Sequence, residues 1–252
     1  EDGYSVQWID PQEVHNLVPE VSENILGAVF TTGVADVEPY RLMLALTTAC
    51  EKMGVNIIHT RAQGLNYKKS SVESVSTDRG DIYCDSAVLA MGPWSLNASE
   101  WIKQDIPITP LKGQILRMKS DEVNLNISVG WRGNYACTKP DGLLWAGTTE
   151  ENTGFDDSTS AFGRDSVLTA LTKMINGLDS AELVHHTACL RPLSADGKII
   201  LGDVPNISHL FIASGTGRKG ILLGPGMGKL TSDLITNQPI GIDLNPFSLS
   251  RF

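Results

Sequence analysis

The sequence has few cysteines, few charged residues and no long apolar run, and each shortage excludes a class of protein. The four cysteines, Cys50, Cys84, Cys137 and Cys189, lie far apart with no C-x-x-C pair, so neither a zinc site nor a redox pair is indicated. No run approaches the roughly 18 apolar residues that a membrane-spanning helix needs. We therefore expect reduced thiols in a cytoplasmic protein without a membrane span.

A net positive charge is also absent. The formal net charge is -9 with 19% charged residues, so the chain offers no electrostatic footprint for nucleic acid or an anionic membrane. With 252 residues, 41% of them hydrophobic, it is long enough to bury a sizeable core in one large domain or two modest ones. The chain begins at Glu1 instead of a methionine, and we expect further residues upstream.

The spacing of apolar residues predicts three helices. Three-and-four spacing, which is typical of an amphipathic helix, occurs over residues 36 to 53 and again over 160 to 177, where Val167 and Leu171 share a face. Residues 221 to 235 form the third predicted helix.

Short β-type runs fill most of the remaining sequence. Residues 55 to 60 predict a buried strand, and residues 63 to 83 predict a small antiparallel meander. Further β-type runs lie at residues 87–91, 113–118, 127–131, 134–138, 143–148, 182–190, 198–202 and 209–214. Strands mixed with helices in this order predict an α/β architecture, α+β-like in part, with an inserted antiparallel sheet.

The segment SGTGRKGILLGPGMGK, residues 214 to 229, carries Gly215, Gly217 and Gly220 in the spacing G-x-G-x-x-G. A dinucleotide-binding fingerprint also needs a second strand and an acidic residue about 20 positions on, and only a short tail remains here. A P-loop is excluded as well, because Lys229 is followed by Leu instead of Ser or Thr. The glycines therefore do not predict a phosphate cradle.

Two interpretations of this segment stay open from the residues alone. Backbone N–H groups at a glycine-rich helix start can converge on an electronegative ligand atom, and Arg218 can add a bidentate grip on a carboxylate. Alternatively, the glycines form a turn packed on its own sheet, with Arg218 in solvent.

Five ordered motifs carry a resemblance to a known family. The run CLRPLSADGKIILG with the glycine segment resembles the C-terminal signature of the FAD-dependent D-amino acid oxidase family, which includes glycine oxidase and sarcosine oxidase. The other motifs agree in order: DVEPYRLMLALTTACEKMGVNI, SAVLAMGPWS, PLKGQILRM and NYACTKPDGLLWAGTTEENTGFD. Together they cover nearly the whole chain.

The resemblance implies two functional halves. Residues 36–102 and 188–252 would be the remainder of an FAD-binding domain, and residues 1–35 and 103–187 a substrate domain built on a mostly antiparallel sheet. The family opens with a βαβ unit that holds the ADP half of FAD, and no residue of this chain matches that unit. We therefore expect this chain to be a fragment of a longer oxidase.

Site residues follow from the resemblance position by position. Arg191 matches an arginine that pairs with the substrate carboxylate, Arg218 a second polar position near the substrate, and Tyr135 a tyrosine at the mouth of the active site. The alternatives are a structural arginine at 191 and a half-buried sheet residue at 135. The positions expected to lie near FAD are Ala90, Met91, Gly92, Trp94, Gly215, Gly217, Arg218, Lys219, Gly220 and Ile221.

Two further positions have competing interpretations. Cys189 matches the cysteine that carries flavin covalently in monomeric sarcosine oxidase, and the alternative is a buried, inert thiol. Glu150 and Glu151 follow a strand end and would favour a cationic group of the substrate, unless they belong to a solvated turn.

The resemblance implies an FAD-dependent oxidoreductase that acts on the C–N bond of an amino acid or secondary amine, with O2 or another electron acceptor. The substrate would be of the glycine, sarcosine or D-amino acid type. The alternatives are a non-catalytic fragment or accessory subunit that binds a small carboxylate or a protein partner, and a β-rich structural module. Exposed surface at the edge of the missing unit would favour a homo-oligomer.

Overall fold

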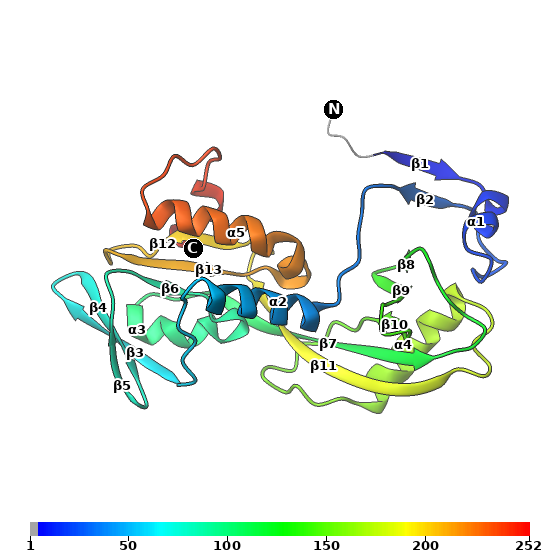
Figure 1. Ribbon diagram of the computed structural model, residues 1–252, viewed down its shortest axis with the longest axis horizontal. Coiled ribbons are helices and arrows are strands. Elements are labelled where there is room, and N and C mark those ends of the chain that lie inside the picture. The colour runs from blue at the N-terminus through cyan, green and yellow to red at the C-terminus, as the bar shows by residue number, and fades with distance from the viewer. Residues whose placement is uncertain (1–4) are drawn as a thin grey trace. The chain divides into compact units, whose positions relative to one another are not determined.

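The computed structural model describes residues 5–252, which form two compact units (Figure 1). Unit 1 consists of the described residues up to Lys52 together with Lys112–Glu151 and Asp156–Cys189, and unit 2 of Met53–Leu111, Asn152–Phe155 and Leu190–Phe252. The boundaries of these units differ from those of the two functional halves expected from the sequence, and the functional halves stay a prediction. The expectation about Glu1 concerns a residue outside the described range.

Unit 1 is built on a five-stranded sheet in the order β11-β7-β10-β9-β8. The strands are β7 (Ile108–Lys119), β8 (Val129–Trp131), β9 (Asn134–Thr138), β10 (Leu144–Gly147) and β11 (Glu182–Ser194). The strand β10 pairs antiparallel with both β7 and β9, and β8 pairs antiparallel with β9. The chain of β7 and of β11 continues from one unit into the other.

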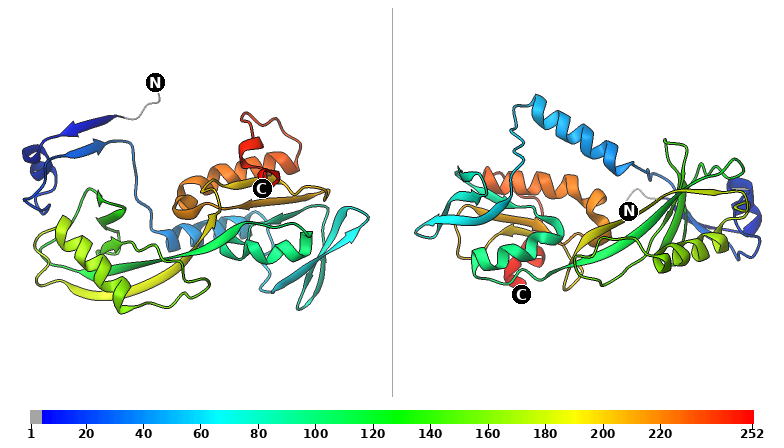
Figure 2. Two further views of the ribbon diagram at one scale, coloured as in Figure 1. Left: turned by 180° about the vertical axis from the view of Figure 1, so that it is seen from behind. Right: turned by 90° about the horizontal axis from the view of Figure 1, so that it is seen from below.

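One face of this sheet is closed by helix α4 (Ala161–Met174), as Figure 2 shows. Ser160 caps the helix by accepting a hydrogen bond from the backbone N–H of Gly163. Because side chains alternate across a strand, Leu116 of β7 and Ala146 of β10 face the helix, and both are buried with Leu171 in one core. The predicted helix over 160 to 177 is confirmed, including its buried face.

A second part of the same core comes from the N-terminal segment, where the sequence suggested no element. Strand β1 (Val6–Ile9), helix α1 (Pro11–Leu17) and strand β2 (Ala28–Thr31) follow one another, and β1 pairs antiparallel with β2. Ile9 and Val14 are buried in the core of α4. Asp10 caps α1 with its side chain, and Pro11 occupies the first helical position.

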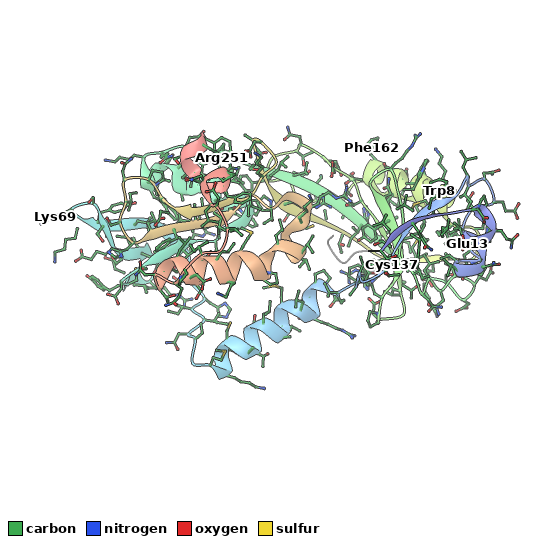
Figure 3. The ribbon with its side chains drawn as sticks, turned by 90° about the horizontal axis from the view of Figure 1, so that it is seen from above. Trp8, Glu13, Lys69, Cys137, Phe162 and Arg251 are labelled. Carbon is green, nitrogen blue, oxygen red and sulfur yellow. The ribbon has the colours of Figure 1, made fainter. Side chains whose placement is uncertain are left out.

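Helix α2 (Pro39–Lys52) confirms the helix predicted over 36 to 53 but buries none of its residues. The segment that leads into it is held on the sheet of unit 1 by Lys139, whose Nζ atom lies 3.2 Å from Asp36 Oδ1 and donates to the backbone carbonyl of Val37. In Figure 3 the side chains of α2 project from the helix without an element of unit 1 packed on them.

Unit 2 contains two three-stranded sheets. In the first, β13 (Leu210–Ser214) pairs antiparallel with β12 (Ile200–Asp203) and parallel with β6 (Ala87–Leu89). In the second, β3 (Ala62–Lys68), β4 (Ser71–Thr77) and β5 (Gly80–Tyr83) form an antiparallel meander, as predicted. Helix α5 (Gly220–Ile235) packs on β12 and β13.

The other elements of unit 2 are short helices. They are α3 (Ser99–Ile102) and the 3-10 helices η1 (Gly92–Ala98), η2 (Gly217–Lys219), η3 (Asn245–Phe247) and η4 (Leu249–Arg251). Leu89 of β6 and Ile212 of β13 are buried in the core of this unit together with Leu249 of η4.

One strand prediction is wrong. Residues 55 to 60 form no strand, and Val55, Ile57 and Ile58 are 52%, 44% and 55% exposed. An apolar run becomes a strand only where another strand offers hydrogen-bond partners, and none pairs with it among the described residues. The mixed α/β class and the antiparallel sheets are confirmed. Over residues 5–252, no helix combines the length and apolar character needed to cross a membrane.

Candidate functional site

The most ordered part of the candidate site is the rim of unit 2 where two parallel strands end. Strand β6 leads to Gly92 and strand β13 leads to Gly215. Ser95 Oγ and Ser214 Oγ lie 2.8 Å apart, and the carbonyl oxygen of Gly92 lies within hydrogen-bond distance of both, at 2.7 and 3.2 Å. Because each hydroxyl has one proton, one serine donates to the other and the second donates to Gly92. In open α/β sheets, ligands bind at the carboxyl ends of neighbouring parallel strands.

No pattern in the sequence pointed to the two serines that join these turns. Both are buried, Ser95 with no exposed surface and Ser214 with 3%. Serine is common in turns, and only the pairing of β6 with β13 shows that residues 119 positions apart share hydrogen bonds. The two glycine turns therefore form one rigid rim.

The glycines of the 214 to 229 segment have different structural reasons. Gly215 has a φ of +78°, and a Cβ there would lie 3.1 Å from the backbone nitrogen of Ile200. This glycine is required by packing, as the second interpretation of the segment held. Gly92, with a φ of +54°, has no heavy atom of the described residues beyond its chain neighbours within 4 Å of an ideal Cβ, and the same is true of Gly224 in helix α5. At these two positions packing does not require glycine.

The start of helix α5 has no side-chain cap. Lys219 occupies the N-cap position and its side chain makes no capping hydrogen bond. Its own backbone N–H donates to the carbonyl oxygen of Thr216 in the 3-10 turn that precedes the helix. Arg218, Lys219 and Ile221 are exposed around this end, while Gly217 and Gly220 are half-buried. The aligned peptide dipoles favour negative charge at a helix N-terminus. The arrangement suits an electronegative edge of a ligand.

Arg191 lies on β11 in unit 2 and is half-buried. An antiparallel bridge between Leu193 and Thr216 ties the end of β11 to the glycine segment, so Arg191 and Arg218 belong to two elements that are joined directly. The turn after β11 is held by Asp196, whose Oδ2 atom lies 2.8 Å from Arg251 Nε. The Arg251 guanidinium, labelled in Figure 3, keeps the pKa of Asp196 well below its usual range.

Ala90 and Trp94 are exposed on either side of Gly92, and Met91 is half-buried. The Trp94 ring stacks on Phe155 with ring centroids 6.0 Å apart, although Trp94 and Phe155 stay 51% and 43% exposed. Two stacked but accessible aromatic rings next to the rim offer a flat apolar surface.

Tyr135 lies on β9 of unit 1, on the sheet face opposite α4, and is half-buried. Its neighbours on that face include Trp145, whose ring carries the Arg117 guanidinium carbon 3.9 Å from its centroid. Tyr135 is therefore a half-buried sheet residue, and its role at the mouth of the active site stays a prediction.

Cys189 is exposed on β11, so the interpretation of a buried, inert thiol is wrong. It lies on the edge strand of the five-stranded sheet. Cys50, Cys84, Cys137 and Cys189 are all free cysteines. Within residues 5–252, no group of three His, Cys, Asp or Glu side chains is arranged to hold a metal ion.

A buried polar network in unit 1 was not foreseen. Lys112 and Gln114 of β7 are 2% and 0% exposed. Lys112 Nζ lies 2.8 Å from Asp156 Oδ2 and 3.6 Å from Glu151 Oε2, and Gln114 Nε2 donates to Glu151 Oε1 at 2.7 Å. Thr149 also donates to Glu151, at 2.5 Å. The network holds the segment between β10 and α4 on the sheet.

This network gives Glu151 a structural role. Burial alone would raise the pKa of Glu151, but hydrogen bonds from Thr149 and Gln114 and the charge of Lys112 outweigh it, so the pKa is lowered. Glu151 therefore holds the segment after β10 as a carboxylate, and a role of either glutamate toward a substrate stays a prediction. Glu150 is exposed. The alternation of Lys112 and Gln114 with apolar residues in PLKGQILRM was the one signal that pointed to the network.

Comparison with known proteins gives a family match over most of the chain. The model of the family described as FAD dependent oxidoreductase matches residues 1–234. Glycine oxidase from Pseudomonas putida is 30% identical over 242 residues, which cover 95% of this chain and 66% of that protein. The chain thus spans slightly less than two thirds of the length of this relative.

Solved structures give the same result for the fold. The crystal structure of glycine oxidase from Geobacillus kaustophilus matches with a TM-score of 0.94 at 29% identity, covering 99% of this chain and 68% of that one. The crystal structure of iminodiacetate oxidase from Chelativorans sp. matches with a TM-score of 0.88 at 25% identity, covering 97% and 67%.

Proposed function

The chain belongs to the family of FAD-dependent oxidoreductases, and from this membership we propose that it forms the larger part of an enzyme that oxidises the C–N bond of an amino acid or secondary amine. The substrate class is a small amine that carries a carboxylate, of the glycine, sarcosine or D-amino acid type. O2 or another acceptor would take up the electrons.

The single observation that carries the proposal is the rim at the ends of β6 and β13. Two glycine turns are locked together there by Ser95 and Ser214, and the uncapped start of α5 follows directly. Open space at Gly92 lets a planar ring approach the backbone, and N–H donors with the helix dipole suit its electronegative edge. These residues fit the flavin ring of FAD.

The residues proposed to lie along the flavin follow from this fit. They are Ala90, Met91, Gly92, Trp94, Gly215, Gly217, Arg218, Lys219, Gly220 and Ile221. When bound, the flavin would supply the hydride acceptor for the carbon next to the amine nitrogen. Within residues 5–252, the strand β13, the glycine segment and helix α5 are followed by no second strand, so they are not assigned to the pyrophosphate of FAD.

Arg191 and Arg218 are proposed to bind the substrate. A planar guanidinium donates two parallel hydrogen bonds to a carboxylate, which fixes both the position and the orientation of an amino acid. With the carboxylate held, the hydrogen on the neighbouring carbon is kept in one direction, and this positioning supplies most of the catalytic effect. Tyr135 is proposed to contribute its phenol at the mouth of the active site, and Cys189 is proposed as a position for a covalent flavin bond.

The test uses the whole protein as its gene encodes it. We expect bound FAD to be reduced by glycine, sarcosine or D-alanine without oxygen, seen as loss of flavin absorbance. Arg191→Lys removes the bidentate contact and should raise KM by roughly 10- to 100-fold. Arg79→Lys, at an exposed turn of the same unit, is the matched control. Flavin that binds but is reduced by no amine or amino acid would favour the accessory-subunit alternative instead.

Covalent attachment has its own test. Acid precipitation of the holoprotein should leave part of the flavin with the pellet if Cys189 carries it, and Cys189→Ser should release all of it. Flavin found only in the supernatant of the unaltered protein removes Cys189 from the cofactor site. The cytoplasmic location and the homo-oligomeric state stay predictions.

A further inference from the structure

The face of the unit 1 sheet opposite helix α4 has one row of residues with an unusual pattern of sizes. Ile115 of β7 pairs with Gly147 of β10, Gly147 pairs with Tyr135 of β9, and Tyr135 pairs with Gly130 of β8. Residues directly opposite each other on an antiparallel pair share a face of the sheet and interact. Tyr135 is therefore flanked by a glycine on both neighbouring strands.

The two glycines are not equivalent. An ideal Cβ at Gly147 would lie 3.0 Å from Tyr135 Cε1 and 3.4 Å from Tyr135 Cζ, whereas the only heavy atom within 4 Å of an ideal Cβ at Gly130 is the carbonyl oxygen of Asn134, at 3.6 Å. The phenol ring thus leans across β10 over Gly147 and away from β8. Neither glycine has a positive φ, so a left-handed backbone conformation is not the reason for glycine at 147.

The space above Gly147 is closed from the other side. The same ideal Cβ would lie 2.7 Å from Ile115 Cγ2, and real Cβ atoms essentially never come so close to another atom. Ile115 is β-branched and stiff at χ1. A methyl group at 147 would be wedged between a stiff isoleucine and the tyrosine ring. Because the side of Gly130 is open, the ring is the part that would move.

The next row on the same face shows the opposite pattern. There Arg117 of β7 pairs with Trp145 of β10, and Trp145 pairs with Cys137 of β9. A large residue on β10 faces a small one on β9, while in the row of Tyr135 the large residue is on β9. The volumes complement each other across the strands, as close packing requires. A larger side chain on one strand of such a pair would therefore displace the side chain opposite it on the other strand.

We propose that Gly147 is a positioning residue for Tyr135: by lacking a side chain, it lets the phenol ring lie across β10 and so fixes where the hydroxyl group stands at the mouth of the active site. This inference rests on the role proposed above for Tyr135. Gly147 does not itself touch the substrate, and its effect passes through the tyrosine ring.

The kinetic test compares Gly147→Ala with Gly130→Ala in the whole, flavin-loaded protein. Displacement of a positioning side chain by about 1 Å is costly, so Gly147→Ala should raise KM for the amine by about tenfold or more, with a smaller change in kcat. Gly130→Ala should stay within about twofold of the unaltered protein. In a Tyr135→Ala background, adding Gly147→Ala should change KM by no more than about twofold, because the ring is gone.

A second readout does not depend on turnover. With tyrosine rings labelled with carbon-13, the resonance of Tyr135 is assigned by its loss in Tyr135→Phe. It should shift in Gly147→Ala and stay in place in Gly130→Ala. If that holds while no amine reduces the flavin, the positioning role stands and the proposed function fails.

Three results overturn the positioning role itself. They are an unchanged Tyr135 resonance in Gly147→Ala, equal shifts in the two glycine variants, and an effect of Gly147→Ala on KM that persists without the Tyr135 ring. The last would place the effect in the backbone of β10 instead of the ring.

Discussion

Helices α2 and α4 have the same length, 14 residues, and both were predicted from the same apolar spacing, yet only one of them buries its apolar face. Helix α4 buries Val167, Leu171 and Met174 against the sheet of unit 1. Helix α2 leaves Met43 and Leu46 54% and 50% exposed. Sequence periodicity therefore predicts that a helix has an apolar face and cannot tell whether the chain supplies a surface to cover it.

The two helices also differ in what holds their first turn. Helix α4 starts at Ser160, which caps it and is tied to Gln114 by two hydrogen bonds, from Gln114 Nε2 to Ser160 Oγ and from the Ser160 backbone N–H to Gln114 Oε1. Helix α2 starts at Pro39, after Glu38, whose carboxylate accepts from the backbone N–H of Arg41 at 2.7 Å. Helix α2 thus has a capped start, and its difference from α4 is that none of its residues is buried within residues 5–252.

The largest expected effect on stability comes from removing a side chain on the face of α4 that is buried against the sheet of unit 1. Leu171 has no exposed surface, so Leu171→Ala should lower the free energy of unfolding by about 2–5 kcal/mol through lost burial and a residual cavity. Leu46→Ala in α2 should change it by no more than about 0.5 kcal/mol. Urea denaturation measures both. Similar losses for the two variants would mean that α2 is covered as α4 is, and the comparison would fail.

An added methyl group tests how tightly the start of α4 is packed on the sheet of unit 1. An ideal Cβ at Gly163 would lie 2.1 Å from Gln114 Nε2 and 2.3 Å from Gln114 Cδ. Gly163→Ala should therefore displace Gln114 and lower the free energy of unfolding by about 1–3 kcal/mol, although alanine favours a helix more than glycine does. Ser166→Ala, at an exposed position of the same helix, is the control and should not destabilise. A stabilised Gly163→Ala variant would show that α4 does not sit tightly on Gln114.

The same contrast explains which parts of the fold could be predicted from the sequence. Helices α2, α4 and α5 and the β3 to β5 meander are set by local spacing and turn residues, so they were predicted within a few positions. Residues 55 to 60 were expected to pair, and pairing depends on a partner strand that apolar residues alone do not identify. Strands β1 and β2 were missed because four residues each give little periodicity.

The site was predictable only where function follows from a motif. The glycine segment could be assigned to the start of a helix, but its spacing did not separate Gly215, which packing requires, from Gly224, which leaves open space. Glu151 could not be recognised as structural, because its partner Gln114 lies 37 residues earlier on another strand. Such roles depend on contacts between segments distant in the sequence.

A smaller effect is expected from changing the exposed apolar face of α2. Apolar side chains on an exposed helix favour association with other molecules, so Leu46→Glu should leave the unfolding midpoint nearly unchanged and reduce any self-association of the chain. Thr48→Glu adds the same charge at an exposed polar position of α2 and should reduce association less. Sedimentation velocity over a range of protein concentrations measures both. Equal behaviour of the two variants would show that charge, and not the apolar face, controls association.

The smallest effect is expected from a buried histidine nitrogen. Among the described residues, two buried side-chain nitrogens have no hydrogen-bond partner, Arg117 Nε and His186 Nε2. His186 Nε2 is buried without a partner, and burial lowers the pKa of His186, reinforced by the charge of Arg164 and partly opposed by Glu151. The unfolded chain, with a histidine pKa near 6.5, then binds more protons than the folded chain between the folded pKa and about pH 6.5. Stability therefore falls as the pH is lowered through that window, and the loss is complete below the folded pKa. The melting temperature should drop more between about pH 7.5 and about pH 5.5 in the unaltered protein than in His186→Gln. Because the other four of the 5 histidines are present in both proteins, an equal drop would show that His186 is as accessible to protons when folded as when unfolded.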